Sequence, residues 1–199
     1  MKQIVLLLIA SVSLQCTDRN KSESGKKKEI DLAPQQKSDS LLLNHNIDSE
    51  TDPDQLKSEV SRLNGATSIK KIKSENGKFI ITYVKNYKEY KELNPQSGLK
   101  ENDLKLYWST GSTIQKTLVG SPARLMKKFN FINEIEIILP FQNKIYQIDV
   151  KRAELEKFVG KSISEIENDW INSFADPYIY DQKGREQFLR KFGTIKNRN

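Results

Sequence analysis

The chain has 199 residues, enough for one domain of ordinary size with an appendage and too few for most multidomain enzymes. Its 33 Lys and Arg residues outnumber its 26 Asp and Glu residues, and 36% hydrophobic residues with a mean hydropathy of -0.66 exclude a protein with several membrane spans. A single histidine, His45, and a single cysteine, Cys16, exclude internal disulfides and argue against Cys-rich zinc sites and Ser-His-Asp triads.

The amino terminus has the pattern of a secretory signal. Lys2 supplies one positive charge, an apolar-to-small run extends from Ile4 to Leu14, and Cys16 precedes a polar segment. As a helix this run would be about 16 Å long, roughly half the hydrocarbon thickness of a bilayer. We therefore expect residues 1–15 to be a cleaved signal peptide and not a permanent membrane span.

The single cysteine at the expected cleavage point resembles the lipobox of bacterial lipoproteins, in the relaxed form that spirochaetes use. The resemblance covers residues 1–16 only. Ser13, Leu14 and Gln15 stand where the usual box has Leu followed by two small residues. The resemblance implies that the Cys16 sulfur carries diacylglycerol and that its amino group is acylated, so that lipid chains anchor the protein to a membrane.

The resemblance also bears on the destination of the protein. In enteric bacteria, Asp after the lipidated cysteine retains a lipoprotein in the inner membrane, and this chain has Thr17 there. We therefore expect a cell-envelope protein, with the outer membrane favoured over the inner. The alternative is an ordinary signal peptide cleaved near Ser13, which leaves Cys16 as a free thiol.

Residues 16–51 are expected to be the acylated cysteine and a disordered tether, and residues 52–199 a single domain. All seventeen Phe, Tyr and Trp residues lie from Phe79 onward, so the tether cannot bury enough apolar surface to offset its ordering entropy. Residues 17–65 carry 8 basic and 10 acidic side chains, whereas residues 66–199 carry 24 and 16, a net charge of +8. The basic character therefore belongs to the folded part.

The sequence of the first part of the domain predicts a helix followed by a β-hairpin. Asp52-Pro53 supplies an N-cap and a proline at the first helical position, and apolar residues recur at helical spacing up to Asn64-Gly65. Asn76-Gly77 is the strongest short hairpin signal in the chain. It separates two strands expected at 67–74 and 78–85.

The middle of the domain is less regular. We expect a short helix around Tyr87–Leu93, a strand at Leu104–Ser109, and helical periodicity from Ile114 to Phe129. Gly120-Ser121-Pro122 lies within the last of these stretches. Because proline has no N–H for the helical hydrogen-bond ladder, the stretch predicts two short helices or one broken helix.

A second hairpin is predicted by the alternating segments 134–139 and 145–150, with a turn around Gln142-Asn143. Pro140 indicates that the first of these strands ends near an edge of the sheet. Two hairpins interleaved with helices predict an α+β domain, built as a small antiparallel sheet packed with several short helices.

The carboxyl-terminal part predicts short helices with clear signals at their ends. A helix is predicted at Arg152–Val159 and should end at Gly160, and residues 162–167 contain two overlapping capping boxes. A last helix is expected at Arg185–Phe192, followed by a frayed basic tail.

No motif demands an enzyme. Two Ser-x-x-Lys matches, at Ser24 and Ser68, lack the companion motifs of penicillin-recognising enzymes. The acidic residues around Asp52 have calcium-loop spacing, but Pro53 stands where the loop needs glycine, so no metal and no cofactor is expected. The alternative is an envelope hydrolase acting on wall or glycan. It would use paired carboxylates from the Glu165–Asp176 region, about 5 to 9.5 Å apart across a cleft.

Two basic segments are candidate binding elements. Tyr83, Lys85 and Tyr87 begin a stretch that interleaves aromatic and basic residues, as proteins that bind single-stranded nucleic acid do. An exported domain meets anionic lipid, lipopolysaccharide or wall polymers instead, so no nucleic-acid partner is expected. The densest basic cluster outside the tether supplies the candidate surface-binding residues Lys183, Arg185, Arg190 and Lys191.

The favoured interpretation is a lipid-anchored bacterial lipoprotein whose basic domain binds anionic lipid, lipopolysaccharide or an envelope protein. The simpler interpretation of its lysines is a solvated surface without a partner. A structural accessory subunit of an envelope complex is a third interpretation, which predicts an exposed apolar patch of several hundred Å².

Overall fold

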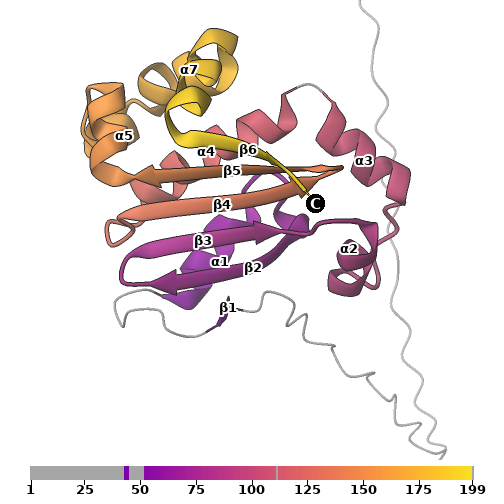
Figure 1. The fold of residues 1–199 in the computed structure, drawn as a ribbon. Coiled ribbons are helices and arrows are strands. Elements are labelled where there is room, and N and C mark those ends of the chain that lie inside the picture. The colour runs from indigo at the N-terminus through magenta and orange to yellow at the C-terminus, as the bar shows by residue number, and fades with distance from the viewer. Residues whose placement is uncertain (1–42, 45–51, 111, 199) are drawn as a thin grey trace, which may run out of the picture. The chain divides into compact units, whose positions relative to one another are not determined.

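A mixed β-sheet organises the part of the chain that the structure, a computed structural model, describes: residues 43–44, 52–110 and 112–198 (Figure 1). Six strands of these residues lie in the sheet in their order along the chain. They are β1 (Leu43–Asn44), β2 (Ile69–Glu75), β3 (Lys78–Tyr83), β4 (Glu134–Phe141), β5 (Lys144–Lys151) and β6 (Gly193–Asn197). None of the helices in the described residues is long and apolar enough to cross a membrane.

Both predicted hairpins are present. β2 and β3 pair antiparallel around Asn76-Gly77, where both residues have positive φ, 50° and 76°. This is the backbone that a type I′ turn requires, and Asn-Gly is its preferred sequence. β4 and β5 pair antiparallel around Gln142-Asn143. At the other end of the sheet, β1 pairs parallel to β2, so Leu43 and Asn44 of the expected tether lie against the domain.

The two hairpins join in parallel, which makes the sheet mixed instead of purely antiparallel. β3 and β4 pair from Lys78 and Glu134 to Thr82 and Ile138, and both strands run in the same direction. Between them the chain forms the helices α2 (Tyr87–Leu93), α3 (Glu101–Ser109) and α4 (Thr113–Lys128). Parallel neighbours need such a crossover connection. The α+β class is confirmed.

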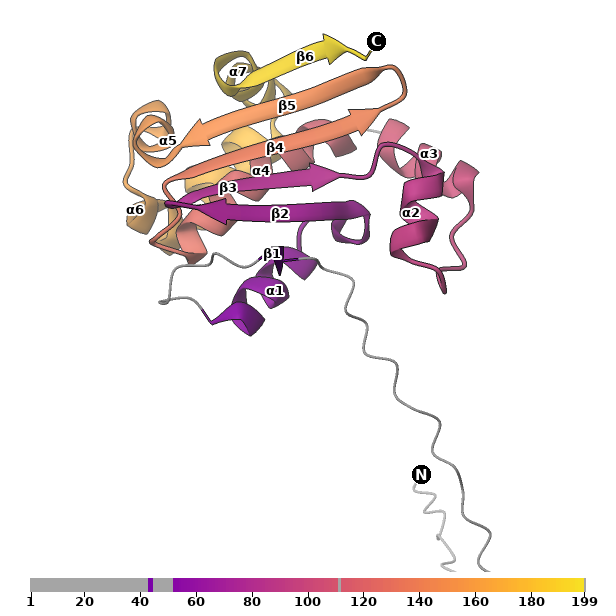
Figure 2. The same ribbon diagram turned by 60° about the horizontal axis from the view of Figure 1, so that its bottom comes forward.

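Helices pack on one face of the sheet. The others are α1 (Pro53–Ser61), the 3-10 turn η1 (Ala66–Ser68), α5 (Arg152–Val159), α6 (Ile163–Asn168), the π-helix η2 (Ile171–Tyr180) and α7 (Gln182–Phe192). Alternate residues of β3 and β4, among them Phe79, Ile81, Ile135 and Ile137, are fully buried, whereas the residues between them are only half-buried. Figure 2 accordingly shows α4 and α7 behind the sheet, with strands β2–β5 in front of them.

Local helix signals are confirmed where they were strongest. The Asp52 side chain caps α1 by accepting a hydrogen bond from the Asp54 N–H at 3.0 Å. α2 and α5 have the predicted bounds, and Gly160 ends α5 with a φ of 75°. Ser162 and Glu165 form a capping box at the start of α6. These signals act within a few residues, so their outcome does not depend on the rest of the fold.

The strand expected at Leu104–Ser109 is wrong: these residues belong to α3. Leu104 and Trp108 are four residues apart and both are buried, whereas Leu106 between them is 59% exposed. In a strand, Leu104, Leu106 and Trp108 would share one face, whereas in a helix Leu104 and Trp108 share a face and Leu106 lies nearly opposite. The apolar pattern alone fits both, and the burial of Leu104 and Trp108 without Leu106 fits the helix.

The broken helix expected between Ile114 and Phe129 is also wrong, because α4 continues through Gly120-Ser121-Pro122. Proline inside a helix costs about 3 kcal/mol or more. Here Ser121 and Pro122 are buried together with most of α4, which packs against both the sheet and α7. Burial of one whole face of a long helix offsets a local cost of that size.

The carboxyl terminus differs from the expectation in two ways. α7 begins at Gln182, three residues early, because the Asp181 side chain caps it by accepting from the Gly184 N–H at 2.7 Å. The tail predicted to fray forms β6 instead, since its backbone finds partners along β5. Pro140 lies two residues beyond Ile138, the last β4 residue that pairs with β3, so it sits at the end of that ladder although β4 is an interior strand.

Candidate functional site

A cavity of about 200 Å³ lies where β3 and β4 end at their carboxyl termini. We call it the aromatic pocket. In open sheets with parallel strands, ligands bind at this end because the strands stop there and the connections diverge. Its lining comes from the β3–α2 connection, α3, the β4–β5 turn and the end of β6: Tyr83, Val84, Lys85, Asn86, Tyr87, Glu101, Leu104, Lys105, Trp108, Leu139, Pro140, Phe141, Gln142, Asn143 and Arg198.

The floor of the aromatic pocket is rigid and apolar. The rings of Tyr83 and Trp108 meet edge to face with centroids 5.5 Å apart. The Tyr83 hydroxyl donates to the Asn64 carbonyl at 3.1 Å, and burial raises the pKa of this phenol well above its usual value. Trp108 is 6% exposed and lies so close to Gly65 that a Cβ there would overlap its ring. Tyr83 is therefore a neutral, fixed part of the floor.

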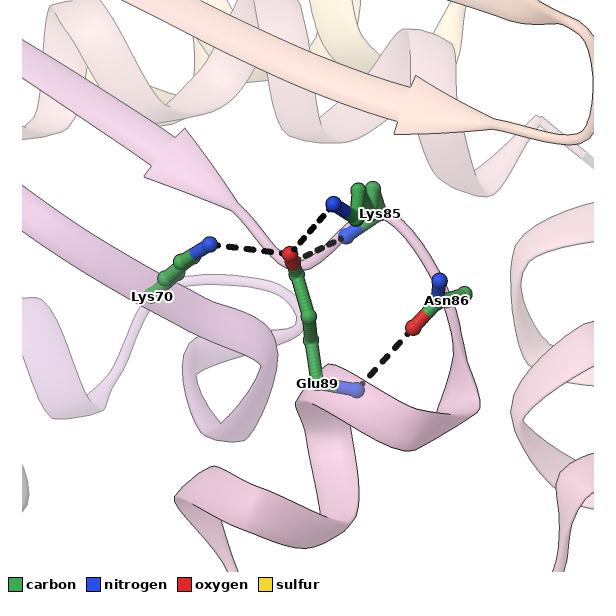
Figure 3. Close-up of polar contacts among 4 residues, drawn as sticks. All are labelled: Lys70, Lys85, Asn86 and Glu89. Atoms are coloured by element: carbon green, nitrogen blue, oxygen red, sulfur yellow. Dashed lines mark hydrogen bonds and ion pairs between the residues drawn. The ribbon is translucent and has the colours of Figure 1, made fainter.

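One carboxylate holds the polar wall of the aromatic pocket in place. Figure 3 shows Glu89 of α2 between Lys70 of β2 and Lys85, which lies in the connection from β3 to α2. The carboxylate accepts from the Lys85 backbone N–H at 2.9 Å and lies 2.9 and 3.1 Å from the ammonium groups of Lys70 and Lys85. The Asn86 side chain completes the arrangement by accepting from the Glu89 N–H at 3.0 Å.

The Glu89 network has a clear electrostatic consequence. Burial alone would raise the pKa of the Glu89 carboxyl, but the hydrogen bonds from Lys85 and Lys70 outweigh it and lower the pKa to about 2. Glu89 is therefore charged at neutral pH and clamps α2 to the ends of two strands. Lys85, Asn86 and Tyr87, which line the aromatic pocket, sit in the segment so held.

The rim of the aromatic pocket is polar and mainly basic. Lys105 pairs with Glu101 at 2.8 Å, Lys85 is engaged by Glu89, and Arg198 adds an exposed guanidinium. Three amide side chains at the rim offer donors and acceptors: Asn86, Gln142 and Asn143. An apolar floor with polar groups around it suits a ligand that buries one small ring or branched group and carries a negative charge.

The predicted basic cluster lies on α7, but its four members do not form one surface, because one of them is buried. Lys183 and Arg190 are exposed and lie two turns apart on one side of the helix, about 10 Å along the axis. Lys191 is also exposed; its ammonium lies 3.8 Å from the Glu154 carboxylate. Arg190 lines an apolar groove between α7 and the sheet.

Arg185 is a correction to the predicted surface-binding set, because it is only 5% exposed. Its guanidinium donates to the carbonyls of Ile179, Tyr180 and Asp181 at 2.7 to 3.3 Å, and to Gln115 and Ser112 of α4 and its cap at 3.1 and 3.0 Å. On an α-helix a residue two positions from Lys183 faces nearly the opposite side. Arg185 is thus a buried link between helices.

The carboxylates of the alternative hydrolase are not gathered into a cleft. Glu165 is occupied in its capping box with Ser162, and the Asp169 side chain accepts from Asn172 at 2.8 Å. Asp176 is exposed. Glu167, the fourth carboxylate of this region, is also exposed, and none of the four lines one of the cavities found in the described residues. No group of three or more His, Cys, Asp or Glu in residues 52–110 and 112–198 could hold a metal ion. Cys16 lies outside the described residues.

Part of the aromatic pocket is marked in the sequence, by a pattern that is typical of nucleic-acid binding. Tyr83, Lys85 and Tyr87 stood out because they interleave rings and cations, and the structure places all three in the lining. Trp108, Phe141 and Arg198 come from distant segments, and no local pattern marks them. The chain matches no protein-family model, no curated protein and no solved structure.

Proposed function

We propose that this protein is a lipid-anchored lipoprotein of the bacterial cell envelope and that its basic domain is a binding module whose ligand site is the aromatic pocket. Support for the anchor comes from the signal-like sequence that ends at Cys16. Support for binding comes from the aromatic pocket, whose lining includes the end of β3, α3 and the β4–β5 turn.

The chemistry of the pocket indicates an anionic ligand with a small apolar group. A volume of about 200 Å³ is below the range of about 300–1,000 Å³ usual for drug-sized ligands, so it fits one ring or branched chain. Three cations, Lys85, Lys105 and Arg198, lie on the rim with two carboxylates, Glu101 in the lining and Glu89 beside Lys85, so the rim has one positive charge in excess. Anionic lipids, lipopolysaccharide and acidic envelope proteins all offer both features at the membrane surface.

Mass spectrometry of the protein from a bacterial host tests the anchor. The mature chain should begin at Cys16 and carry the mass of a diacylglycerol, together with an acyl group on the amino terminus. A mature terminus at another residue, or a Cys16 thiol that reacts with an alkylating reagent, would show that the anchoring half of the proposal is wrong.

Titration with phenyl phosphate, a ring that carries an anion, tests the pocket. We expect saturable shifts of the Trp108 indole and Asn143 amide resonances in nuclear magnetic resonance spectra. Phe141→Ser should weaken binding about tenfold by removing apolar contact, and Arg198→Gln should weaken it by removing charge. Lys88→Gln, an exposed change on α2 outside the lining, is the control. Absence of shifts at these residues would contradict the assignment of the pocket.

A further inference from the structure

Strand β6 has a free edge. It is the outermost strand of the sheet in both views (Figures 1 and 2), and no strand of the described residues pairs with its outer side. Arg198 donates its backbone N–H to the Asn143 carbonyl at 2.8 Å. Inward and outward groups alternate in an antiparallel ladder. The backbone N–H and C=O groups of Thr194 and Lys196 therefore also point toward β5, and those of Ile195 and Asn197 point outward at the free edge.

An apolar groove of about 350 Å³ lies beside this edge, on the helix side of the sheet. Its apolar walls come from α4, β5, α7 and β6: Ile114, Leu118, Tyr146, Leu189 and Ile195. Ile195 pairs with Tyr146, so both side chains point toward the helices, yet Ile195 is 62% exposed. A branched side chain beside an open apolar groove has most of its burial free energy still to gain.

The opposite face of β6 is basic. Lys196 pairs with Ile145, so its side chain points to the face away from the helices, and Arg198 adds a second cation just beyond the end of the strand. Both are exposed, and the strand contains no acidic residue. The edge thus offers an apolar groove on one side and Lys196 on the other, with Arg198 at the end of the strand.

We propose that β6 and its groove, together the β6 site, bind an extended segment of a partner protein in which acidic and apolar residues alternate. The segment pairs with Ile195 and Asn197 as an added strand, places its apolar side chains in the groove, and brings its acidic side chains to Lys196 and Arg198. A second copy of β6 fits less well, because pairing would set the cations of both copies against each other.

A synthetic peptide with blocked ends and the sequence Asp-Val-Asp-Leu-Asp-Val-Asp tests the β6 site. Its affinity for the full-length protein in neutral detergent is measured by fluorescence anisotropy of a labelled peptide. We expect saturable binding that weakens as salt is raised. Two control peptides, one with Lys in place of every Asp and one with the four Asp residues grouped before the apolar ones, should bind at least tenfold more weakly.

Substitutions at the free edge separate strand addition from simple charge attraction. Asn197→Pro removes an outward N–H without removing a bond to β5 and should weaken binding at least tenfold, whereas Asn197→Ala keeps that N–H and should bind as the unaltered protein does. Ile195→Asp should abolish binding at the groove, and Lys196→Glu should reduce the preference for the Asp peptide over the Lys peptide. Circular dichroism confirms that each variant is folded.

Three outcomes would overturn the proposal. Equal binding of the alternating and grouped Asp peptides would show charge attraction alone. Unchanged affinity of a folded Asn197→Pro variant would exclude an added strand. A dimer that forms with rising protein concentration and is lost in Ile195→Asp would assign the edge to a second copy. These variants avoid Arg198, which also borders the aromatic pocket, so failure here leaves the pocket tests intact.

Discussion

Arg185 shows how a cation in a basic cluster can be part of the core. Five acceptors surround its guanidinium, three of them carbonyls at the end of η2 and two of them side chains at the start of α4. Charge-assisted hydrogen bonds of this kind are about twice as strong as neutral ones. A single residue therefore ties η2, α4 and α7 together.

Replacing Arg185 should cost far more stability than replacing its exposed neighbour. Arg185→Ala leaves buried carbonyls without donors, and we expect the free energy of unfolding to fall by about 3 kcal/mol. Lys183→Ala, an exposed change on the same helix, should alter it by less than about 0.5 kcal/mol. Urea unfolding followed by Trp fluorescence measures both, and equal effects would contradict the linking role of Arg185.

Glu89 predicts an acid-dependent loss of stability. Its pKa is about 2 in the folded protein, below the ordinary value of 4.5 that it has in an unfolded chain. Its contribution is therefore fully present above pH 4.5 and is lost as the pH falls toward 2. In Glu89→Gln the dependence of unfolding free energy on pH should be shallower in this window. Glu92→Gln, an exposed change on the same helix, is the control. Parallel curves for the two variants would contradict the prediction.

At the scale of elements, the close approach of α7 to η2 depends on one glycine. A Cβ added at Gly184 would overlap the Pro177 carbonyl oxygen, because the first turn of α7 lies against the end of η2. The buried face of α7 continues from this contact to Phe188 and Phe192, whose rings are 4.8 Å apart. Movement of the first turn would disturb that packing.

Gly184→Ala should therefore destabilise the protein by about 2–3 kcal/mol, the cost of forcing extra volume into a packed contact. Gly98→Ala is the matched control, since a Cβ at Gly98 meets nothing within 4 Å. Thermal unfolding of the two variants measures the difference. A Gly184→Ala protein as stable as Gly98→Ala would show that α7 and η2 can separate at little cost.

Whether an element could be predicted from the sequence depends on how far along the chain its deciding contacts reach. The hairpin turn at Asn76-Gly77 and the caps of α1 and α6 follow from contacts within four residues, and these predictions are confirmed. α3, the continuous α4 and β6 could not be predicted, because each is decided by a surface that another segment supplies. For β6 that surface is the edge of β5, from which it is separated by α5, α6, η2 and α7.

At the scale of the whole molecule, backbone amides should be protected from hydrogen exchange most strongly at the centre of the sheet and least at its β6 edge. β3 and β4 have neighbours on both sides and fully buried side chains, whereas β6 has one neighbour among the described strands and is largely exposed. Amides of β3 and β4 should exchange hydrogen only through global unfolding. Within β6, Lys196 should exchange more slowly than Ile195 and Asn197, whose N–H groups point outward. Equal rates along β6 would contradict the register.

The sequence by itself determined the features that depend on composition and short-range geometry: the signal-like segment ending at Cys16, the division of charge between the amino-terminal part and the basic domain, the hairpins, the helix caps and the α+β class. Only the tertiary structure decided which basic residues are exposed, because burial of Arg185 depends on carbonyls and side chains from other elements. The same holds for both candidate binding sites. The walls of the aromatic pocket come from segments as distant as β3 and Arg198, which follows β6, and the walls of the β6 site come from α4, β5, α7 and β6. The parallel pairing of β3 with β4 and the packing of α7 bring these segments together.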